Sequence, residues 1–165
     1  MKTISLTKGQ AALVDDEDYE ELNEHSWCAV QRPNGKWYAT RTITHWNRRT
    51  KERSLECVLM HRVVLQGTIE VDHRDGNGLN NQRANLRPAT RKQNGANRGK
   101  FASRTTSRFK GVSWNARARK WQAGIKVDGK SKYLGSFGDE VDAARAYNRA
   151  AGEHFGAFAR PNTIE

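Results

Sequence analysis

The apolar residues of this chain come in short runs, and this limits what the chain can fold into. Hydrophobic residues make up 36% of the 165 positions. None of their runs approaches the roughly 18 residues needed to cross a bilayer. So few apolar residues, in such short runs, favour several small modules over one large core. The start reaches Lys8, Gly9 and Gln10 too early for the apolar segment of a signal peptide. We therefore expect a cytoplasmic protein that makes no contact with a membrane.

Positive charge is concentrated toward the C-terminus. Residues 1–58 hold 9 Lys and Arg against 9 Asp and Glu, residues 59–97 hold 6 against 3, and residues 98–165 hold 14 against 6. A phosphate backbone attracts a surface of this kind, so the charge pattern predicts binding to nucleic acid. An anionic membrane fits less well, because the sequence has no strongly basic amphipathic helix.

Two cysteines, Cys28 and Cys57, are the only ones in the chain. They form no Cys-x-x-Cys pair, which excludes a four-cysteine zinc site and makes a disulfide framework an unsuitable interpretation. We expect both to be reduced, buried thiols.

Residues 1–58 have the pattern of a small β-rich unit. Short strands are expected around Ile4 and around Leu13, and an acidic run that starts at Asp15 favours a helix to about His25. Asn34-Gly35 between two β-prone runs predicts a hairpin whose two central residues have positive φ. A further strand is expected at residues 54–59. Nothing in this unit looks catalytic, and its candidate DNA contacts are Arg32, Lys36, Arg41, Arg48, Arg49 and Lys51.

Residues 59–98 are rich in polar side chains that packing alone does not explain. A strand is expected to end at His73, a loop rich in Gly and Asn to follow to Leu86, and a helix capped by Thr90 to come after a short return strand. Asp72 and His73 are neighbours on a strand, so they serve one site only if the strand twists or ends there. Asn77, Asn80 and Asn81 are interpreted as turn formers that tolerate left-handed backbone.

These residues resemble the HNH nuclease motif, which is a strand–loop–strand–helix site also called ββα-metal. The resemblance covers about 40 residues and rests on His61, on Asp72-His73 with the following loop, on Asn85-Leu86-Arg87, and on Gln93-Asn94. It is closest to the homing-endonuclease branch found in phages and mobile introns. The sequence has Asn94 where the strictest pattern has a histidine.

The resemblance implies a role for each of these residues. His73 would be the general base, since a histidine that titrates near neutrality can take a proton from water. Asp72 and Asn94 would hold a divalent cation, Mg²⁺ or alternatively Mn²⁺, through carboxylate and amide oxygens. Asn85 would bridge the loop and hold the strand of His73. His61 is a candidate phosphate contact, although a structural role is favoured for it.

Residues 109–163 follow a basic linker at 99–108 and form a separate pattern. Trp121, Ala123, Ile125 and Val127 alternate with polar residues, Asp128-Gly129 predicts a hairpin turn, and an alanine-rich helix is expected from Asp139 to Ala151. The segment resembles the ethylene-response-factor (Apetala-type) DNA-binding domain of plants. That resemblance implies a three-stranded antiparallel sheet backed by one helix, with the sheet in the major groove.

Candidate DNA contacts in this module sit where the plant domain uses arginines and a tryptophan, or are further basic and aromatic residues nearby. They are Lys110, Ser113, Trp114, Asn115, Arg117, Arg119, Lys126, Lys130, Lys132 and Tyr133. Serine and lysine cannot bind guanine through two parallel hydrogen bonds as arginine does, so the plant target sequence is not expected to carry over.

The sequence as a whole predicts an α+β protein with a β-rich N-terminal unit (1–58), an HNH core (59–98) and a sheet–helix module (109–163). The expected function is metal-dependent cleavage of double-stranded DNA in a bacterial or phage-infected cell. A catalytically silent DNA-binding regulator is the alternative. An RNA-binding protein fits less well, because no trio of exposed stacking aromatics is evident. Whether the chain acts as a monomer or a homodimer is left open.

Overall fold

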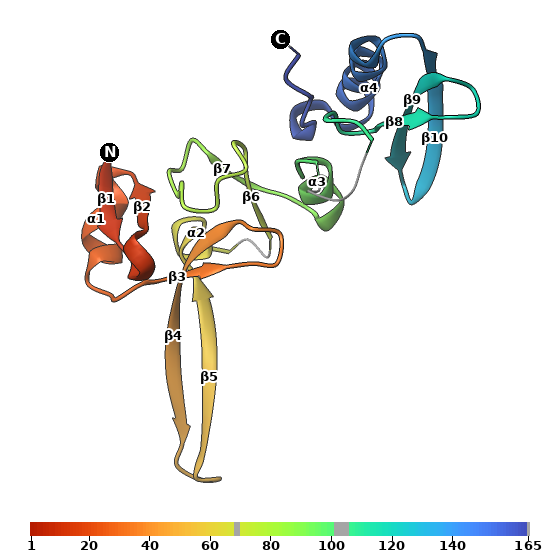
Figure 1. The fold of residues 1–165 in the computed structure, drawn as a ribbon. Coiled ribbons are helices and arrows are strands. Elements are labelled where there is room, and N and C mark those ends of the chain that lie inside the picture. The colour runs from red at the N-terminus through yellow and green to blue at the C-terminus, as the bar shows by residue number, and fades with distance from the viewer. Residues whose placement is uncertain (68–69, 101–105, 165) are drawn as a thin grey trace. The chain divides into compact units, whose positions relative to one another are not determined.

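A computed structural model describes residues 1–67, 70–100 and 106–164 of the chain. The chain divides into two compact units, Met1–Thr90 and Arg91–Glu165, and both contain strands and helices (Figure 1). Residues 101–105, the middle of the expected linker, lie outside the described residues. Among the helices that the structure describes, none has the length and apolar character needed to cross a membrane.

The N-terminal unit contains two small antiparallel sheets and one larger one, joined by short helices. Its elements are β1 (Lys2–Ser5), η1 (Thr7–Gly9), β2 (Ala11–Val14), α1 (Asp16–Asn23), β3 (Cys28–Gln31), β4 (Trp37–Asn47), β5 (Glu52–Leu59), α2 (Met60–Val64), β6 (Val71–His73) and β7 (Leu86–Pro88). β1 pairs with β2, β6 pairs with β7, and the three-stranded sheet has the order β3-β4-β5. The strands and the helix expected in residues 1–58 are present.

One hydrophobic core joins most of these elements. It contains Ile4 and Val14 of the first sheet, Ala29 and Ala39 of the second, and Leu86 of the third. The sequence pattern had suggested a separate unit at residues 1–58. In the structure these residues share their core with the strands that follow, because β1–β2 and α1 are too small to bury their apolar faces alone.

The β3–β4 turn differs from the expected one. Only Gly35 has a positive φ, at 79°, whereas Asn34 does not. Arg32 N donates to Lys36 O at 2.9 Å, and Gly35 N donates to Arg32 O at 2.9 Å. Pro33 has a fixed φ that suits the first central position of an ordinary turn, and Gly35 then takes the left-handed position after it. Pro33 therefore determines the turn type, which differs from the type that the Asn-Gly pair favours by itself.

The two cysteines are free, as expected, but both are exposed rather than buried. Cys28 begins β3 directly before Ala29, whose side chain faces the core. Neighbouring side chains on a strand point to opposite faces, so burying Ala29 leaves Cys28 toward solvent. Cys57 lies in the exposed part of β5.

His61 is buried in the core of the N-terminal unit. It follows Met60 on α2, and both side chains are almost inaccessible. Its ring lies edge-on to the ring of Tyr38, with the two centroids 6.0 Å apart. Burial is the main cause that lowers the pKa of His61 from 6.5 to about 3, and nearby positive charge adds to the shift. The His61 side chain therefore packs inside the unit against Tyr38.

The C-terminal unit is a three-stranded antiparallel sheet with a long helix packed on one face. Its elements are α3 (Arg91–Ala96), β8 (Val112–Asn115), β9 (Lys120–Val127), β10 (Lys130–Phe137), α4 (Glu140–Phe155) and η2 (Gly156–Phe158). The strand order is β10-β9-β8. Asp128 and Gly129 both have positive φ, so the β9–β10 turn is the type that the Asp-Gly pair predicted.

Small side chains allow α4 to lie close to the sheet. Ala123 and Ile125 of β9 are buried against the alanines of α4, and Tyr147 is buried beside them. The Asp139 carboxylate caps the helix by accepting from Val141 N at 2.7 Å and Asp142 N at 3.3 Å. α4 continues to Phe155, four residues beyond its expected end.

The acid stability of the N-terminal unit should depend on His61. A histidine whose folded-state pKa is lowered supports folding fully above its unfolded pKa of 6.5, and this support is lost as pH falls toward about 3. Between pH 6.5 and 5 this costs about 2 kcal/mol of unfolding free energy. His61→Gln should therefore flatten the pH dependence measured by urea denaturation, whereas His25→Gln, at an exposed position, should not. Equal slopes for the two variants would contradict the assignment.

Gly111 should be essential to the C-terminal unit. Its φ is +76°, and an added Cβ would lie 2.1 Å from the Tyr147 ring and 2.7 Å from Gly124 O. Gly111→Ala should therefore lose about 2–4 kcal/mol through overpacking and backbone strain. Gly129→Ala is the matched control, because its φ is +77° but its Cβ would meet nothing within 4 Å. Tryptophan fluorescence during urea unfolding measures both, and equal losses would contradict the packing argument.

Candidate active site

The short strand β6 holds both Asp72 and His73, and all three of its residues are buried. Asp72 lies opposite Arg87 and His73 lies opposite Leu86 in the pairing with β7. Because neighbouring residues on a strand face opposite sides, the two side chains start in different directions. The strand ends at His73, as expected, and Gly76 N donates to His73 O at 2.9 Å in the turn that follows.

Asp72 is held by Arg87. Nε and Nη2 of Arg87 donate to Oδ2 of Asp72 at 2.8 Å and 2.6 Å. Both side chains are nearly inaccessible to solvent. Two charge-assisted bonds to one oxygen fix the direction of the carboxylate. Sequence inspection did not single out Arg87 for this task, although the two-stranded pairing places it directly across from Asp72.

His73 lies in a cluster of aromatic rings with His61 and Tyr38. Its side chain is 5% exposed. Its ring centroid is 4.9 Å from that of His61, with the rings at 89°, and 5.9 Å from that of Tyr38. Burial lowers the pKa of His73, while the Asn81 side chain and the carboxylates of Asp75 and Asp72 act in the opposite direction. The imidazole is therefore neutral at pH 7 and able to accept a proton.

The loop between β6 and β7 is held together by side chains. Nδ2 of Asn85 donates to Asp75 Oδ1 at 3.0 Å and to Asn80 O at 2.8 Å, and Oδ1 of Asn85 accepts from Asp75 N at 3.1 Å. Asn80 Nδ2 donates to the other oxygen of Asp75 at 2.8 Å. Asn85 thus joins the two ends of the loop. Asp75, which sequence inspection passed over, accepts from three residues and is the centre of the network.

The loop asparagines are not left-handed turn residues. Among the described residues other than glycine, positive φ occurs only at Lys8, Lys51, Arg119 and Asp128. Asn77 and Asn80 act through their side chains, which accept from Leu79 N at 3.1 Å and from Gln82 N at 3.4 Å. Asn81 is fully buried and donates to Leu79 O at 3.2 Å. Asparagine is selected here for local hydrogen bonds rather than for backbone freedom.

Residues 1–25 anchor this loop. Leu13 N donates to Leu79 O and Asn81 N donates to Leu13 O, each at 2.8 Å. Asp15 accepts from Arg83 N at 2.8 Å, and Asp18 accepts two bonds from the Arg83 guanidinium at 2.9 Å and 2.6 Å. The acidic start of α1 therefore holds the far end of the loop. This gives the N-terminal segment a task that its sequence alone did not suggest.

Asn94 lies on α3 and belongs to the C-terminal unit, whereas Asp72 and His73 belong to the N-terminal unit. Among the described residues, no three His, Cys, Asp or Glu side chains come together in a way that could hold a metal ion. A cation bound at Asp72 would therefore need amide, solvent or phosphate oxygens among its ligands. Such oxygens are what Mg²⁺ prefers.

The sequence-predicted contacts of the C-terminal unit lie on several surfaces. Strand pairing puts Ser113 opposite Gln122, Lys126 opposite Ser131, and Tyr133 opposite Gly124, on the sheet face away from α4. Asn115 lies on the same face, and Arg117 and Arg119 lie in the β8–β9 turn. Trp114 shares the helix side with Trp121, and Lys130 and Lys132 pair with inward-facing residues of β9.

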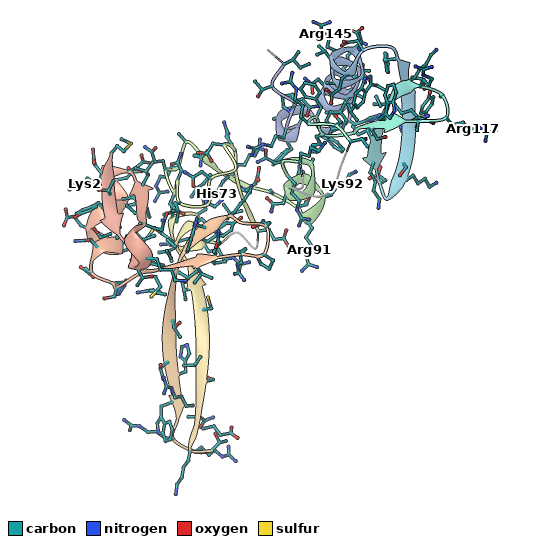
Figure 2. All side chains as sticks on the ribbon, in the orientation of Figure 1. Lys2, His73, Arg91, Lys92, Arg117 and Arg145 are labelled. Atoms are coloured by element: carbon teal, nitrogen blue, oxygen red, sulfur yellow. The ribbon has the colours of Figure 1, made fainter. Side chains whose placement is uncertain are left out.

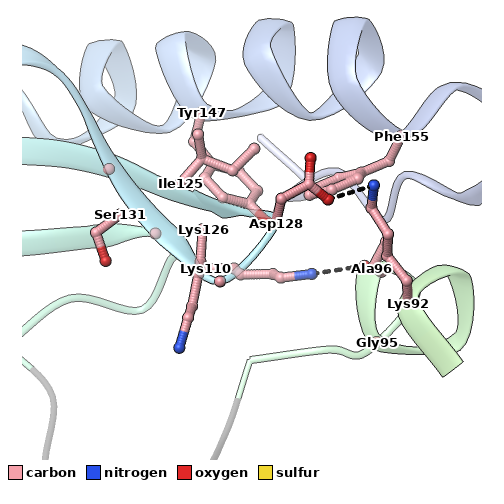
Figure 3. A pocket seen from close by; sticks show the side chains of 13 residues that line it. Lys92, Gly95, Ala96, Lys110, Ile125, Lys126, Asp128, Ser131, Tyr147 and Phe155 are labelled. Atoms are coloured by element: carbon pink, nitrogen blue, oxygen red, sulfur yellow. Dashed lines mark hydrogen bonds and ion pairs between the residues drawn. The ribbon is translucent and has the colours of Figure 1, made fainter.

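Lys110 is engaged inside the C-terminal unit. Its Nζ donates to Ala96 O at 2.8 Å and to Arg98 O at 2.6 Å, at the end of α3 (Figure 3). Burial lowers its pKa to about 8, and the charge of Arg160 adds to the shift. Lys92 of α3 also pairs with Asp128 in the β9–β10 turn. Lys110, a predicted DNA contact, thus binds the end of α3, and Lys92 joins α3 to the β9–β10 turn.

Comparison with known proteins adds an independent observation. A sequence model of the HNH endonuclease family matches residues 58–96 of this chain, which include the β6–β7 pair and α3. A protein of Acanthamoeba polyphaga mimivirus, named as an uncharacterized HNH endonuclease, is 36% identical over 110 residues. That match covers 64% of this chain and 56% of the relative, so the chain spans little more than half of that protein.

A second relative is shorter. Protein 3.8 of Escherichia phage T7 is 36% identical over 90 residues, which are 54% of this chain and 73% of the phage protein. The family match coincides with the segment that holds Asp72, His73 and Asn85, and the second relative is matched over most of its length. The chain therefore belongs to the HNH endonuclease family.

Proposed function

We propose that the protein is a DNA endonuclease in which His73 activates the water that attacks a phosphodiester bond. The observation that carries the proposal is a buried, neutral imidazole next to an oriented carboxylate, at the end of a strand inside the family-matched segment. Family membership and the two viral relatives support a nuclease that acts inside an infected or bacterial cell.

The general base needs a proton-accepting nitrogen at neutral pH. Burial keeps the pKa of His73 below its usual value, so the free base predominates at pH 7. His61 and Tyr38 pack against the His73 ring and restrict its rotation. A base with little freedom loses little entropy when it meets the attacking water.

A divalent cation is proposed to be held by Asp72 and Asn94. Arg87 fixes the carboxylate of Asp72, which makes it a pre-oriented oxygen ligand. When bound, a hard cation such as Mg²⁺ would stabilise charge on the phosphate and on the departing oxygen. In this proposal Asn85 is a positioning residue. Its three hydrogen bonds close the loop that follows His73 and so hold the end of β6 in place.

Double-stranded DNA is the proposed partner, and the C-terminal unit is proposed to bind it in the manner of the plant ethylene-response-factor domain. Support comes from the three-stranded sheet backed by α4. It also comes from the basic and polar side chains on the sheet face away from α4. The internal bonds of Lys110 reduce the set of direct contacts. The basic candidates that remain on exposed positions are Arg117, Arg119, Lys126, Lys130 and Lys132.

His73→Ala should abolish Mg²⁺-dependent cleavage while DNA binding is retained. Loss of a general base typically costs about 10²–10⁴ in rate. The measurement is plasmid cleavage over time, together with a gel shift in EDTA, and His25→Ala serves as an exposed control. If His73→Ala cuts as fast as the wild type, the mechanism is wrong. If the wild type binds DNA but does not cut it with any divalent metal that is added, the chain is a regulator instead.

Asn94→Ala should raise the Mg²⁺ concentration needed for half-maximal cleavage by about tenfold or more, in line with the loss of one oxygen ligand. Alanine is a strong helix former, so α3 should persist. Gln93→Ala removes a neighbouring amide from the same helix and should leave the metal titration unchanged. Identical titration curves for the two variants would remove Asn94 from the proposed site.

A further inference from the structure

The β4–β5 hairpin extends beyond the core of the N-terminal unit as a two-stranded ribbon. The two strands pair from Thr40 opposite Leu59 to Asn47 opposite Glu52. Eight residue pairs span roughly 24 Å. Figure 1 shows the ribbon standing away from the other elements of this unit. We call residues 41–58 the ribbon.

The ribbon exposes large side chains that have no core to cover them. Trp46 is 60% exposed and Leu55 is 62% exposed. Exposed tryptophan is characteristic of interaction surfaces, where its large ring meets a partner. A two-stranded hairpin that buries so little is marginally stable by itself. A partner that packs on the ribbon would account for both features.

The two faces of the ribbon differ in charge. Trp46 lies opposite Arg53 and Thr44 lies opposite Leu55, so these four share one face. The carboxylates of Glu52 and Glu56 lie on the other face, where Glu56 accepts from His45 at 2.8 Å. We call the face with Trp46 and Arg53 the open face. It carries positive charge and no acid.

The turn at the end of the ribbon is basic and ordered. It exposes Arg48, Arg49 and Lys51. The Asn47 side chain accepts from Arg49 N at 3.0 Å and from Thr50 N at 3.2 Å. Lys51 takes a left-handed backbone with φ of 54°. Glu52 directly follows the turn on the face away from Trp46, and the other acidic residues outside the ribbon lie chiefly in and beside α1.

We propose that the ribbon enters a groove of the substrate DNA, with its turn on the phosphates and its open face toward the bases. The proposal rests on DNA being the substrate. A two-stranded antiparallel ribbon fits the width of the major groove. Charge complementarity favours DNA over an acidic or apolar protein partner, because the basic turn leads and the acids face away.

The placement gives the ribbon a separate part in DNA cleavage. His73 lies in the body of the N-terminal unit, away from the turn of the ribbon (Figure 2). The contacts made by the ribbon therefore lie away from the bond that is cut. They add affinity and fix the register of the DNA on the enzyme, and they take no part in the chemical step.

The test is DNA binding as a function of salt, measured by fluorescence anisotropy with a labelled duplex in EDTA. Arg48→Ala combined with Arg49→Ala should weaken binding and reduce the slope of log K against log salt by about 1–2, since each phosphate contact contributes about 0.9. Trp46→Ala should weaken binding with an unchanged slope, because it removes no charge.

Lys2→Glu is the control, because it lowers the net charge by the same amount at the other end of the N-terminal unit (Figure 2). Wild-type affinity and slope in the double variant, or a loss no larger than that of Lys2→Glu, would overturn the ribbon proposal. A wild type that binds DNA without cutting it would overturn the proposed nuclease function and leave the ribbon proposal standing. A wild type that does not bind duplex DNA would overturn both.

Discussion

The position of His73 depends on a loop that has almost no apolar residues to hold it. Asp75 and Asn85 supply the constraint by joining the two ends of the loop through side-chain and backbone hydrogen bonds. Leu13 and Asp15 then fix the loop to the first sheet and to the start of α1. These bonds lie at exposed or half-buried positions, so the loop is held by hydrogen bonds at the surface of the unit. The first 25 residues therefore help to position the loop that follows His73.

Much of the local structure could be predicted because short-range physics decides it. The Asp128-Gly129 turn, the Asp139 cap and the inward face of β9 follow from backbone preference, capping and alternation. The type of the β3–β4 turn could not be predicted from Asn34-Gly35, since Pro33 competes for the turn. The exposure of Cys28 depended on which face of β3 met the core. The candidate site was found by its pattern of residue types, but its supports Arg87 and Asp75 depend on strand pairing and loop closure.

The contacts of α3 show why motif and compact unit need not coincide. The family match runs from the end of β5 through α3, whereas the division between compact units falls at Thr90. Lys110 binds the end of α3 through two carbonyl oxygens, and Lys92 pairs with Asp128. These are polar contacts over long sequence separations, which a local pattern does not reveal. The helix with the proposed ligand Asn94 thus belongs to the unit proposed to bind DNA.

The ribbon also carries a risk of misassembly. Beyond Thr40 the outer edge of β4 has no partner strand among the residues that the structure describes, and open edges invite pairing with another chain. The ribbon is rich in residues that favour strand pairing, which are the threonines and Ile43 of β4 and Val58 of β5. Arg48, Arg49, Lys51 and Arg53 would repel the same residues of a second copy. The charges proposed to bind DNA would then also keep the free protein from adding strand to strand, and DNA would relieve their mutual repulsion when it binds.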